Sequence, residues 1–295
     1  MKKLMLVVNP KAGRGAYRNN FGEALNVLQN GGYCTTVFFT EKKGDAIELT
    51  ARNAPDFDTI ACIGGDGTLS EVMGGLMRAE KRPPLGYFPM GTANDVATTL
   101  NLPKNDILSA AERMLASQPH PYDVGGFGTD GYFAYIAAFG AFTEASYATP
   151  QSQKKMLGNL AYVLQGAMLL PKIQAYHAVV EYDDGVVEAN LMYGSMSNST
   201  SAAGIFRLPE QMVSLGDGRS ELVLIKDPGG IEGLREMLAS VITQRYDSDK
   251  LLVLHTRHAK FTFDQPMPWT RDGEAGGEFQ ELELFNYEAP IEMIF

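Results

Sequence analysis

Short apolar runs alternate with helix-like segments over the first 116 residues of the chain. The runs are rich in β-branched or aromatic residues, and the segments between them have apolar side chains at helical spacing. Because parallel strands need a crossover connection, this alternation predicts an α/β domain with a parallel sheet covered by helices. The expected strands are Lys3–Val8, Tyr33–Phe39, Thr59–Ile63 and Leu85–Phe88, and the expected helices are Arg18–Gln29, Asp45–Arg52, Thr68–Met77, one from Asn94, and Ile107–Ala116.

After about Tyr122 the pattern changes to strands joined by turns, which predicts a second, mainly antiparallel domain. We expect domains over 1–122 and 123–285. The helix expected over 154–170 has a broad apolar face, which indicates a core-facing helix or, alternatively, one that contacts a membrane or an acyl chain. The other elements expected here are a hairpin of 177–182 and 186–193, strands at 222–225, 251–255, 260–263, 280–285 and 291–294, and a helix at 231–244.

The composition limits the class of protein. The 295 residues are 45% hydrophobic and 20% charged, as in a globular chain with a sizeable core. The net charge of −10 argues against broad nucleic-acid binding, which needs a basic face. Cys34 and Cys62 lie in apolar, strand-like runs, so we expect two buried free thiols. Neither a secretory signal nor an apolar stretch of the roughly 20 residues that a membrane helix needs is visible, so the expected compartment is the cytoplasm.

The strongest chemical signal is the junction Gly64-Gly65-Asp66-Gly67-Thr68, which follows an apolar strand and opens a helix. Three glycines in four positions let backbone amides converge on an anion, and the start of a helix, which Thr68 can cap, favours phosphate. Asp66 would repel a bare phosphate, but it suits a divalent cation that bridges carboxylate and phosphate. A tight turn with a capping aspartate is the alternative. The longer string in this context favours a nucleotide-phosphate site.

Two further loops follow neighbouring strands of the predicted sheet. Pro89–Asp95 lies between a strand and a helix, where Asn94 could simply cap the helix. Asn9–Gly15 follows the first strand and supplies Lys11 and Arg14, which are cations suited to phosphate. Open α/β sheets bind ligands at the carboxyl ends of their strands, so we expect the three loops to share one phosphate site.

Late in the chain, Asp272-Gly273-Glu274 offers two carboxylates two positions apart. On an extended strand both side chains would point to the same side, and we expect both to face a cleft between the domains. Phosphoryl transfer needs positioned groups, charge neutralisation and a carboxylate near the attacking hydroxyl. Asp-Gly is also a common turn pair, so an acidic surface turn is the alternative.

These motifs together resemble the diacylglycerol kinase catalytic-domain family of lipid kinases, which has the three loops in this order. Asn198, Gly204, Pro209 and Asp217-Gly218 also look like the family's mid-chain pattern. The resemblance implies an N-terminal nucleotide-binding α/β domain and a C-terminal antiparallel β-sandwich domain that takes the lipid substrate. It further implies that the last segment, 286–295, returns to the first domain.

The resemblance also implies roles for single residues. Glu274 matches the proton acceptor of the family, and Asp272 is its close partner. Asp217 matches a metal-binding aspartate, with the carbonyls of Ser214 and Arg219 as companions. The positions that match the nucleotide site are Asn9, Thr40, Gly64, Gly65, Asp66, Gly67, Thr68, Leu69, Ser70, Thr92, Asn94 and Asp95.

We therefore expect an ATP- and Mg²⁺-dependent kinase that phosphorylates a lipid hydroxyl, with diacylglycerol as the first candidate and phosphatidic acid as the product. Its expected partners are ATP and a lipid at the membrane surface, so it would be cytoplasmic and peripheral to the membrane. No nucleic-acid partner is expected, and a homodimer is a possible assembly. Two alternatives stay open: an NAD kinase-like enzyme, and a non-catalytic nucleotide- or lipid-binding regulator on the same scaffold.

Overall fold

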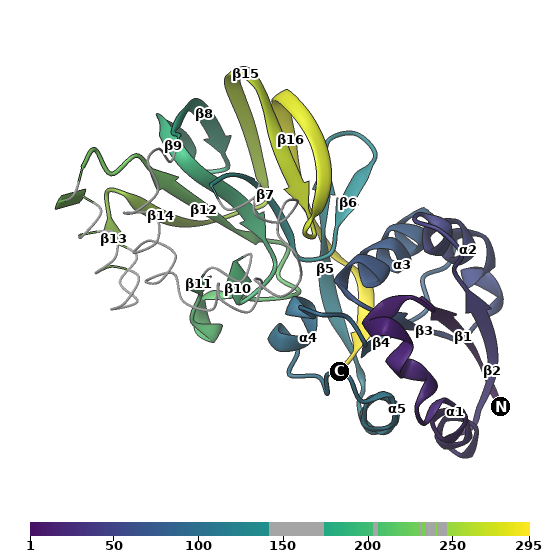
Figure 1. Cartoon of the computed structure of the whole chain (residues 1–295). Coiled ribbons are helices and arrows are strands. Elements are labelled where there is room, and N and C mark those ends of the chain that lie inside the picture. The colour runs from purple at the N-terminus through teal and green to yellow at the C-terminus, as the bar shows by residue number, and fades with distance from the viewer. Residues whose placement is uncertain (142–173, 203–205, 231, 234–235, 237–239, 241–246) are drawn as a thin grey trace. The chain divides into compact units, whose positions relative to one another are not determined.

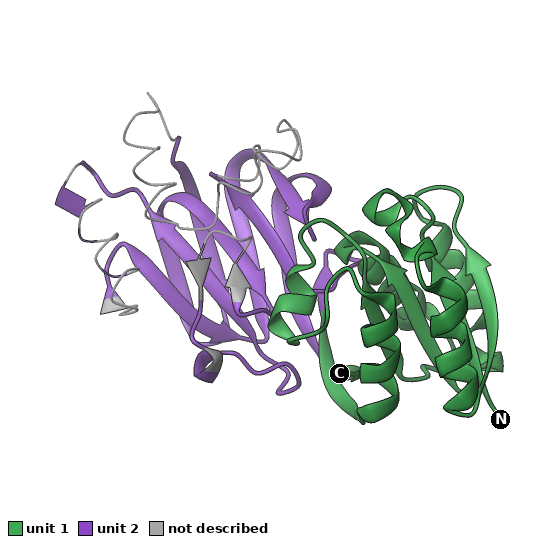
Figure 2. Ribbon diagram, turned by 60° about the horizontal axis from the view of Figure 1, so that its bottom comes forward, with its two compact units in different colours: residues 1–124, 288–295 green, residues 125–287 purple. Residues whose placement is uncertain are grey.

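The computed structural model describes residues 1–141, 174–202, 206–230, 232–233, 236, 240 and 247–295 (Figure 1). Contacts divide the chain into two compact units: unit 1 is Met1–Val124 with Glu288–Phe295, and unit 2 is Gly125–Tyr287 (Figure 2). The chain passes from one unit to the other within two strands, β5 (Pro119–Phe127) and β16 (Glu274–Ile294). The sequence places these boundaries after residues 122 and 285, close to where the units divide.

Unit 1 contains a sheet in the order β2-β1-β3-β4, with the end of β16 beside β4, and all these pairs are parallel. The strands are β1 (Lys2–Val8), β2 (Tyr33–Phe39), β3 (Thr59–Gly64) and β4 (Leu85–Pro89). The helices between and after them are η1 (Ala12–Arg18), α1 (Phe21–Asn30), α2 (Asp45–Asn53), η2 (Ala54–Asp56), α3 (Asp66–Arg78), α4 (Asp95–Thr99) and α5 (Ile107–Ala116).

Burial differs between the central strands and the edge of this sheet. β3 and β4 are buried throughout, as expected for parallel strands covered on both faces. β2 lies at the edge, and Cys34 on it is exposed, so the expectation of a buried thiol there is wrong. Apolar neighbours in the sequence did not distinguish an edge strand from a central one. Cys62 in β3 is buried as expected, and burial raises the pKa of its thiol, which keeps it protonated.

The parallel register brings the carboxyl ends of four strands to one edge of the sheet. Val8 lies opposite Phe39 on one side and Ile63 on the other, and Ile63 lies opposite Phe88. The loops that follow these residues are therefore neighbours in space, although the chain separates them by many residues.

Unit 2 is built on antiparallel pairs that run in the order β13-β14-β12-β9-β7-β15-β16. β8 also pairs with β9 and β15, beside β7. These pairings join the described strands in one continuous network, because the long strands β9 and β15 each pair with β8 along one part and with β7 along another. The elements are β6 (Gly131–Phe133), β7 (Ile136–Gly140), β8 (Tyr176–Tyr182), β9 (Gly185–Ser197), β10 (Ser201–Ala202), β11 (Phe206–Arg207), η4 (Glu210–Met212), β12 (Ser220–Lys226), β13 (Asp247–Ser248), β14 (Leu251–Thr256) and β15 (His258–Arg271).

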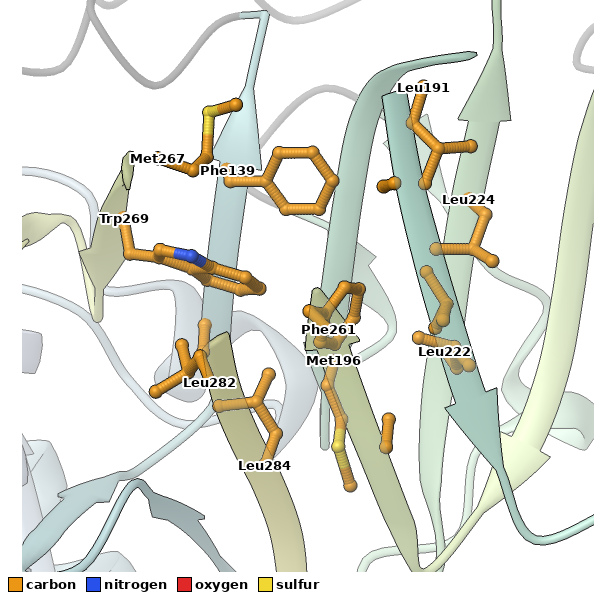
Figure 3. Packing of buried hydrophobic residues seen from close by; sticks show 14 of the residues in the cluster. Phe139, Leu191, Met196, Leu222, Leu224, Phe261, Met267, Trp269, Leu282 and Leu284 are labelled. Atoms are coloured by element: carbon orange, nitrogen blue, oxygen red, sulfur yellow. The ribbon is translucent and has the colours of Figure 1, made fainter. Parts of the chain in front are cut away.

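An aromatic cluster occupies the core of unit 2 (Figure 3). The rings of Phe139 and Phe261 each lie 5.0 Å from that of Trp269, centroid to centroid. Such tilted and edge-on pairs add to the gain from burying the rings.

Several expected elements differ from the structure. β16 is one continuous strand where two separate strands, 280–285 and 291–294, were expected. The helix expected over 154–170 lies outside the described residues, as do Gly204 and most of the helix expected over 231–244. None of the helices that the structure describes is long and apolar enough to cross a bilayer.

We predict that Phe261→Ala lowers the free energy of unfolding of unit 2 by about 3–5 kcal/mol, the usual cost of truncating a buried phenylalanine. Phe261 is fully buried against Trp269, which is the one tryptophan of the chain, so its fluorescence reports the unfolding of this unit in denaturant. Val186→Ala is the control, because Val186 is 63% exposed in the same unit. Equal unfolding midpoints for the two variants would contradict the role given to this cluster.

Candidate functional site

The loops at the carboxyl edge of the unit 1 sheet are tied to one another through their backbones. The amide of Met90 donates to the Gly64 carbonyl at 2.7 Å, and that of Asn9 donates to the Ile63 carbonyl at 2.9 Å. The Asn9 side chain then donates from Nδ2 to Thr68 Oγ1 at 3.0 Å. The loops after β1, β3 and β4 therefore meet, as expected for loops that follow the carboxyl ends of neighbouring parallel strands.

Glycines allow these loops to approach closely. A Cβ on Gly91 would lie 2.5 Å from the Cα of Gly65, and a Cβ on Gly13 would lie 2.5 Å from the Met90 carbonyl oxygen. Neither position can take a side chain unless the backbone moves. Gly67 differs, because a Cβ there would meet nothing within 4 Å. Its missing side chain leaves open space beside the first turn of α3.

The N-terminus of α3 has no side-chain cap. Gly65 is the N-cap residue, and Thr68 lies one turn inside the helix, where its amide donates to the Gly65 carbonyl at 3.0 Å. The expectation that Thr68 caps this helix is therefore wrong, because the helix begins at Asp66, two residues earlier than predicted. The first amides of a helix carry partial positive charge and favour an anion.

Asp66 links the loop after β3 to the helix after β4. Its Oδ2 accepts from the Asp95 amide at 3.0 Å and its Oδ1 accepts from the Val96 amide at 3.2 Å, so it caps the start of α4. The side chain is 8% exposed. Burial raises the pKa of Asp66, and the two amide hydrogen bonds and the charge of Lys104 act in the opposite direction.

Asn94 organises the loop before α4 from within. It has a left-handed backbone with φ +53°, and its Oδ1 accepts from the Gly91 amide at 2.9 Å and from the Tyr87 hydroxyl at 3.3 Å. Its Nδ2 donates to the Gly91 carbonyl at 3.0 Å. The side chain therefore holds its own loop and makes no cap hydrogen bond to α4. Thr92, at the tip of this loop, is exposed.

The other residues expected at the nucleotide site differ in accessibility. Thr40 is 8% exposed and its amide donates to the Val8 carbonyl at 3.0 Å, next to the other strand ends. Leu69 is fully buried, so its side chain belongs to the core of unit 1. Ser70 and Asp95 are partly exposed.

The two cations expected at the first loop are both exposed. Lys11 donates from its ammonium to the Glu41 carbonyl at 3.3 Å, toward the loop after β2. Arg14 lies in the left-handed region with φ +57°, between two glycines of the same conformation. Because Gly13, Arg14 and Gly15 are all left-handed, the segment η1 is a kinked turn and not a regular helix.

Sequence reasoning missed side chains that act across the fold. Glu71 accepts from the amides of Gly44 and Ala46 at 2.8 and 3.3 Å, and so fixes the start of α2. Lys104 contacts the loop before α4 from a turn that follows it. The contacts of Glu71 join residues that are distant in sequence, and those of Lys104 depend on how the turn after α4 folds back, so no sequence pattern marks either.

In unit 2, Asp272 and Gly273 form the turn between β15 and β16, where Arg271 pairs with Glu274. Their φ angles of +49° and +77° are typical of a two-residue type I′ hairpin turn. The expectation that the two carboxylates share one side of an extended strand is therefore wrong, because the strand ends between them. Glu274 is exposed, whereas Asp272 is 6% exposed.

The Asp272 carboxylate is a backbone anchor. It accepts hydrogen bonds from the amides of Ala134, Tyr135 and Ile136 at 2.7, 3.0 and 3.2 Å. The Asp272 amide donates to the Ile136 carbonyl at 2.9 Å, which closes the contact from the other side. The hairpin turn is thus fixed against the start of β7, and the position of Glu274 follows from it.

The candidate metal residues lie in an exposed turn before β12. Asp217 and Ser214 are exposed, and the Asp217 Oδ1 accepts from the Arg219 amide at 3.0 Å. Among the described residues, no group of three or more His, Cys, Asp or Glu side chains gathers as a metal site would require. Nearby, the buried Asn198 accepts from the Ser220 hydroxyl at 2.6 Å and donates to Asn286 Oδ1 at 3.2 Å, so it joins β9, β12 and β16.

Comparison with known proteins places this arrangement in a family. A sequence model of the diacylglycerol kinase catalytic domain matches residues 3–127. The diacylglycerol kinase of Bacillus subtilis (strain 168) is 32% identical over 278 residues, which cover 94% of this chain and 91% of that protein. The diacylglycerol kinase of Staphylococcus epidermidis (strain ATCC 12228) is 30% identical over 293 residues, 99% of this chain and 92% of that one.

The fold agrees with these matches. A crystal structure of a protein from Bacillus anthracis (strain Sterne) superposes with a TM-score of 0.84, covering 100% of this chain and 95% of that one at 24% identity. Its similarity concerns the fold alone. The whole-length sequence matches carry the assignment: the chain belongs to the diacylglycerol kinase family of lipid kinases.

Proposed function

We propose that the chain transfers the terminal phosphoryl group of ATP to the hydroxyl of a membrane lipid, with diacylglycerol as acceptor and phosphatidic acid as product. The observation that carries the proposal is the meeting of three glycine-containing loops at the uncapped N-terminus of α3. Converging backbone amides and a helix dipole suit the phosphates of a nucleotide.

The nucleotide would lie along the carboxyl ends of the strands of unit 1. Gly67 and the first amides of α3 would receive phosphate, because the space beside them is open. Asn9, Thr40 and Thr92 would line the remainder of the site from three different loops. Asp66 would keep the loops in place through α4 rather than contact the phosphates itself.

Mg²⁺ fits this site only when the nucleotide is bound as well. Mg²⁺ usually takes one or two carboxylates, substrate phosphates and several waters. Asp95 is partly exposed at the start of α4 and could supply a carboxylate, while each Asp66 oxygen already accepts an amide. When bound, the ion would neutralise charge on the transferred group. The turn of Asp217 offers one carboxylate and carbonyls, which suit a hydrated cation.

Glu274 is the proposed proton acceptor. The proton of the lipid hydroxyl would pass to its carboxylate as the new oxygen–phosphorus bond forms, and the bond from the γ-phosphorus to ADP would break. Asp272 does not take part in this proton transfer, because three backbone amides already donate to its carboxylate. We assign it the positioning of Glu274.

Unit 1 would thus act as the nucleotide-binding part and unit 2 as the lipid-binding part of an enzyme that works at the surface of a membrane, on its cytoplasmic side. The NAD kinase-like and regulatory alternatives share the phosphate loops. The family assignment and the retained carboxylate of Glu274 favour the lipid kinase.

The proposal predicts which acceptor is phosphorylated. With radiolabelled ATP and Mg²⁺, the full chain should label diacylglycerol in mixed micelles, and should label neither NAD nor a sphingoid base at a comparable rate. Labelled NAD would favour the rival kinase. ATP binding without labelling of any acceptor would favour the regulator.

Gly67→Ala separates a ligand role from a folding role. We expect it to weaken ATP binding at least tenfold, because a methyl group would fill the space that phosphate needs, while stability rises by up to about 1 kcal/mol from better helix propensity. Gly74→Ala in the same helix is the matched control, since a Cβ there also meets nothing within 4 Å. Calorimetric titration and thermal unfolding measure both quantities. Unchanged ATP affinity in Gly67→Ala would refute phosphate binding at this turn.

Glu274→Gln tests the proton acceptor. We expect kcat to fall by roughly 10²–10⁴-fold, the range of general base groups, with ATP affinity and unfolding temperature unchanged. Asp272→Asn should instead lower the unfolding temperature along with kcat, because an amide cannot accept all three backbone hydrogen bonds in the same way. Full activity of Glu274→Gln would remove it from the mechanism.

A further inference from the structure

Lys104 reaches the candidate phosphate site from outside the three loops. It lies in the turn between α4 and α5, a segment fixed at both ends. The Leu102 amide donates to the Ala97 carbonyl at 2.9 Å, and the Asn105 amide donates to the Pro89 carbonyl at 2.8 Å. Asn101 and Asn105 have φ angles of +50° and +57°, which turn the chain back toward the end of β4.

The Lys104 ammonium binds the loop before α4. It donates to the Ala93 carbonyl at 3.3 Å and to Thr98 Oγ1. The Thr98 hydroxyl in turn donates to the Asn94 carbonyl at 3.1 Å, so its lone pairs face the ammonium. These contacts place a positive charge between the loop before α4 and the end of that helix. The charge is close enough to Asp66 to lower the pKa of that carboxyl.

Lys104 forms no direct ion pair in the described part of the chain, and Asp66 acts on its charge only at longer range. In the part of the chain that the structure describes, no carboxylate lies within ion-pair distance of the Lys104 ammonium. Lys104 is exposed, and its two acceptors are neutral oxygens. An ammonium has three donors, so one remains, and a neutral carbonyl is a weaker partner than a phosphate oxygen.

We propose that Lys104 binds the phosphate chain of the nucleotide, as a cation supplied by the turn after α4 rather than by any of the three glycine-containing loops. The inference rests on the proposed nucleotide site and adds one residue to it. When a nucleotide binds, the ammonium exchanges its neutral acceptors for phosphate oxygens, while the backbone of residues 101–105 keeps its place. Because of this contact, the site should bind ATP and ADP more tightly than adenosine, which has no phosphate.

The experiment measures binding of ATP, ADP and adenosine to the full chain by calorimetry, in Mg²⁺ and without lipid. Lys104→Ala should weaken ATP binding about 10- to 100-fold, the factor that corresponds to losing a hydrogen bond to a charged group. Adenosine binding and the unfolding temperature should not change. Lys81→Ala is the matched control, because Lys81 is also exposed and also donates to a carbonyl, that of Phe57 at 3.0 Å.

A charge exchange makes the test specific. Thr98→Lys added to Lys104→Ala should recover most of the ATP affinity, because it returns an ammonium to the same place. Lys104→Arg should retain most of it. Failure of both to bind ATP better than Lys104→Ala would indicate that Lys104 acts through local structure, which overturns the proposal.

Two other outcomes also overturn it. Equal losses in Lys81→Ala and Lys104→Ala would show a general effect of net charge. Unchanged ATP affinity in Lys104→Ala, beside a wild type that binds ATP, would exclude Lys104 alone and leave the proposed function intact. A wild type that binds no nucleotide would instead contradict the proposed function, and this proposal with it.

Discussion

The carboxylate of Asp66 joins the parts of the candidate phosphate site. It belongs to the loop after β3, yet its hydrogen bonds go to the amides of Asp95 and Val96 after β4. Removing a carboxylate from water is unfavourable, and its raised pKa reflects this cost. The two amides and the positive end of a helix offset it. Asn94 could not replace this acceptor, because its side chain already holds Gly91.

This link explains why aspartate and glycine occur together in the sequence. The carboxylate draws two loops to contact distance, and the loops can come so close only because Gly65 and Gly91 lack side chains. Gly67 is not needed for this packing, since a Cβ added there would meet nothing within 4 Å. The glycines of one short string therefore divide between packing and space for a ligand, a distinction that only the folded chain reveals.

The parts of the fold that the sequence predicted are those set by local patterns. Helix α5 has the bounds expected from the sequence, Ile107–Ala116, and the structure shows that Asp106 caps it through the amides of Leu108 and Ser109. The period-two argument failed for Asp272, because it assumed a strand where positive φ angles make a turn. The contacts of Lys104 could not be predicted, since they depend on how the turn after α4 folds back onto the loop before it.

The last residues of the chain complete the first unit. Met293 of β16 pairs with Leu85 of β4 in parallel register, and the buried Asp123 accepts from the Ala289 amide at 2.6 Å. β16 begins at Glu274, directly after the turn that Asp272 holds, and ends at Ile294 in the core of unit 1. Without this segment the edge of β4 would be left with unpaired backbone groups. The end of β16 therefore completes the sheet that positions the phosphate loops, and this one strand connects the sheet covalently to the proposed proton acceptor.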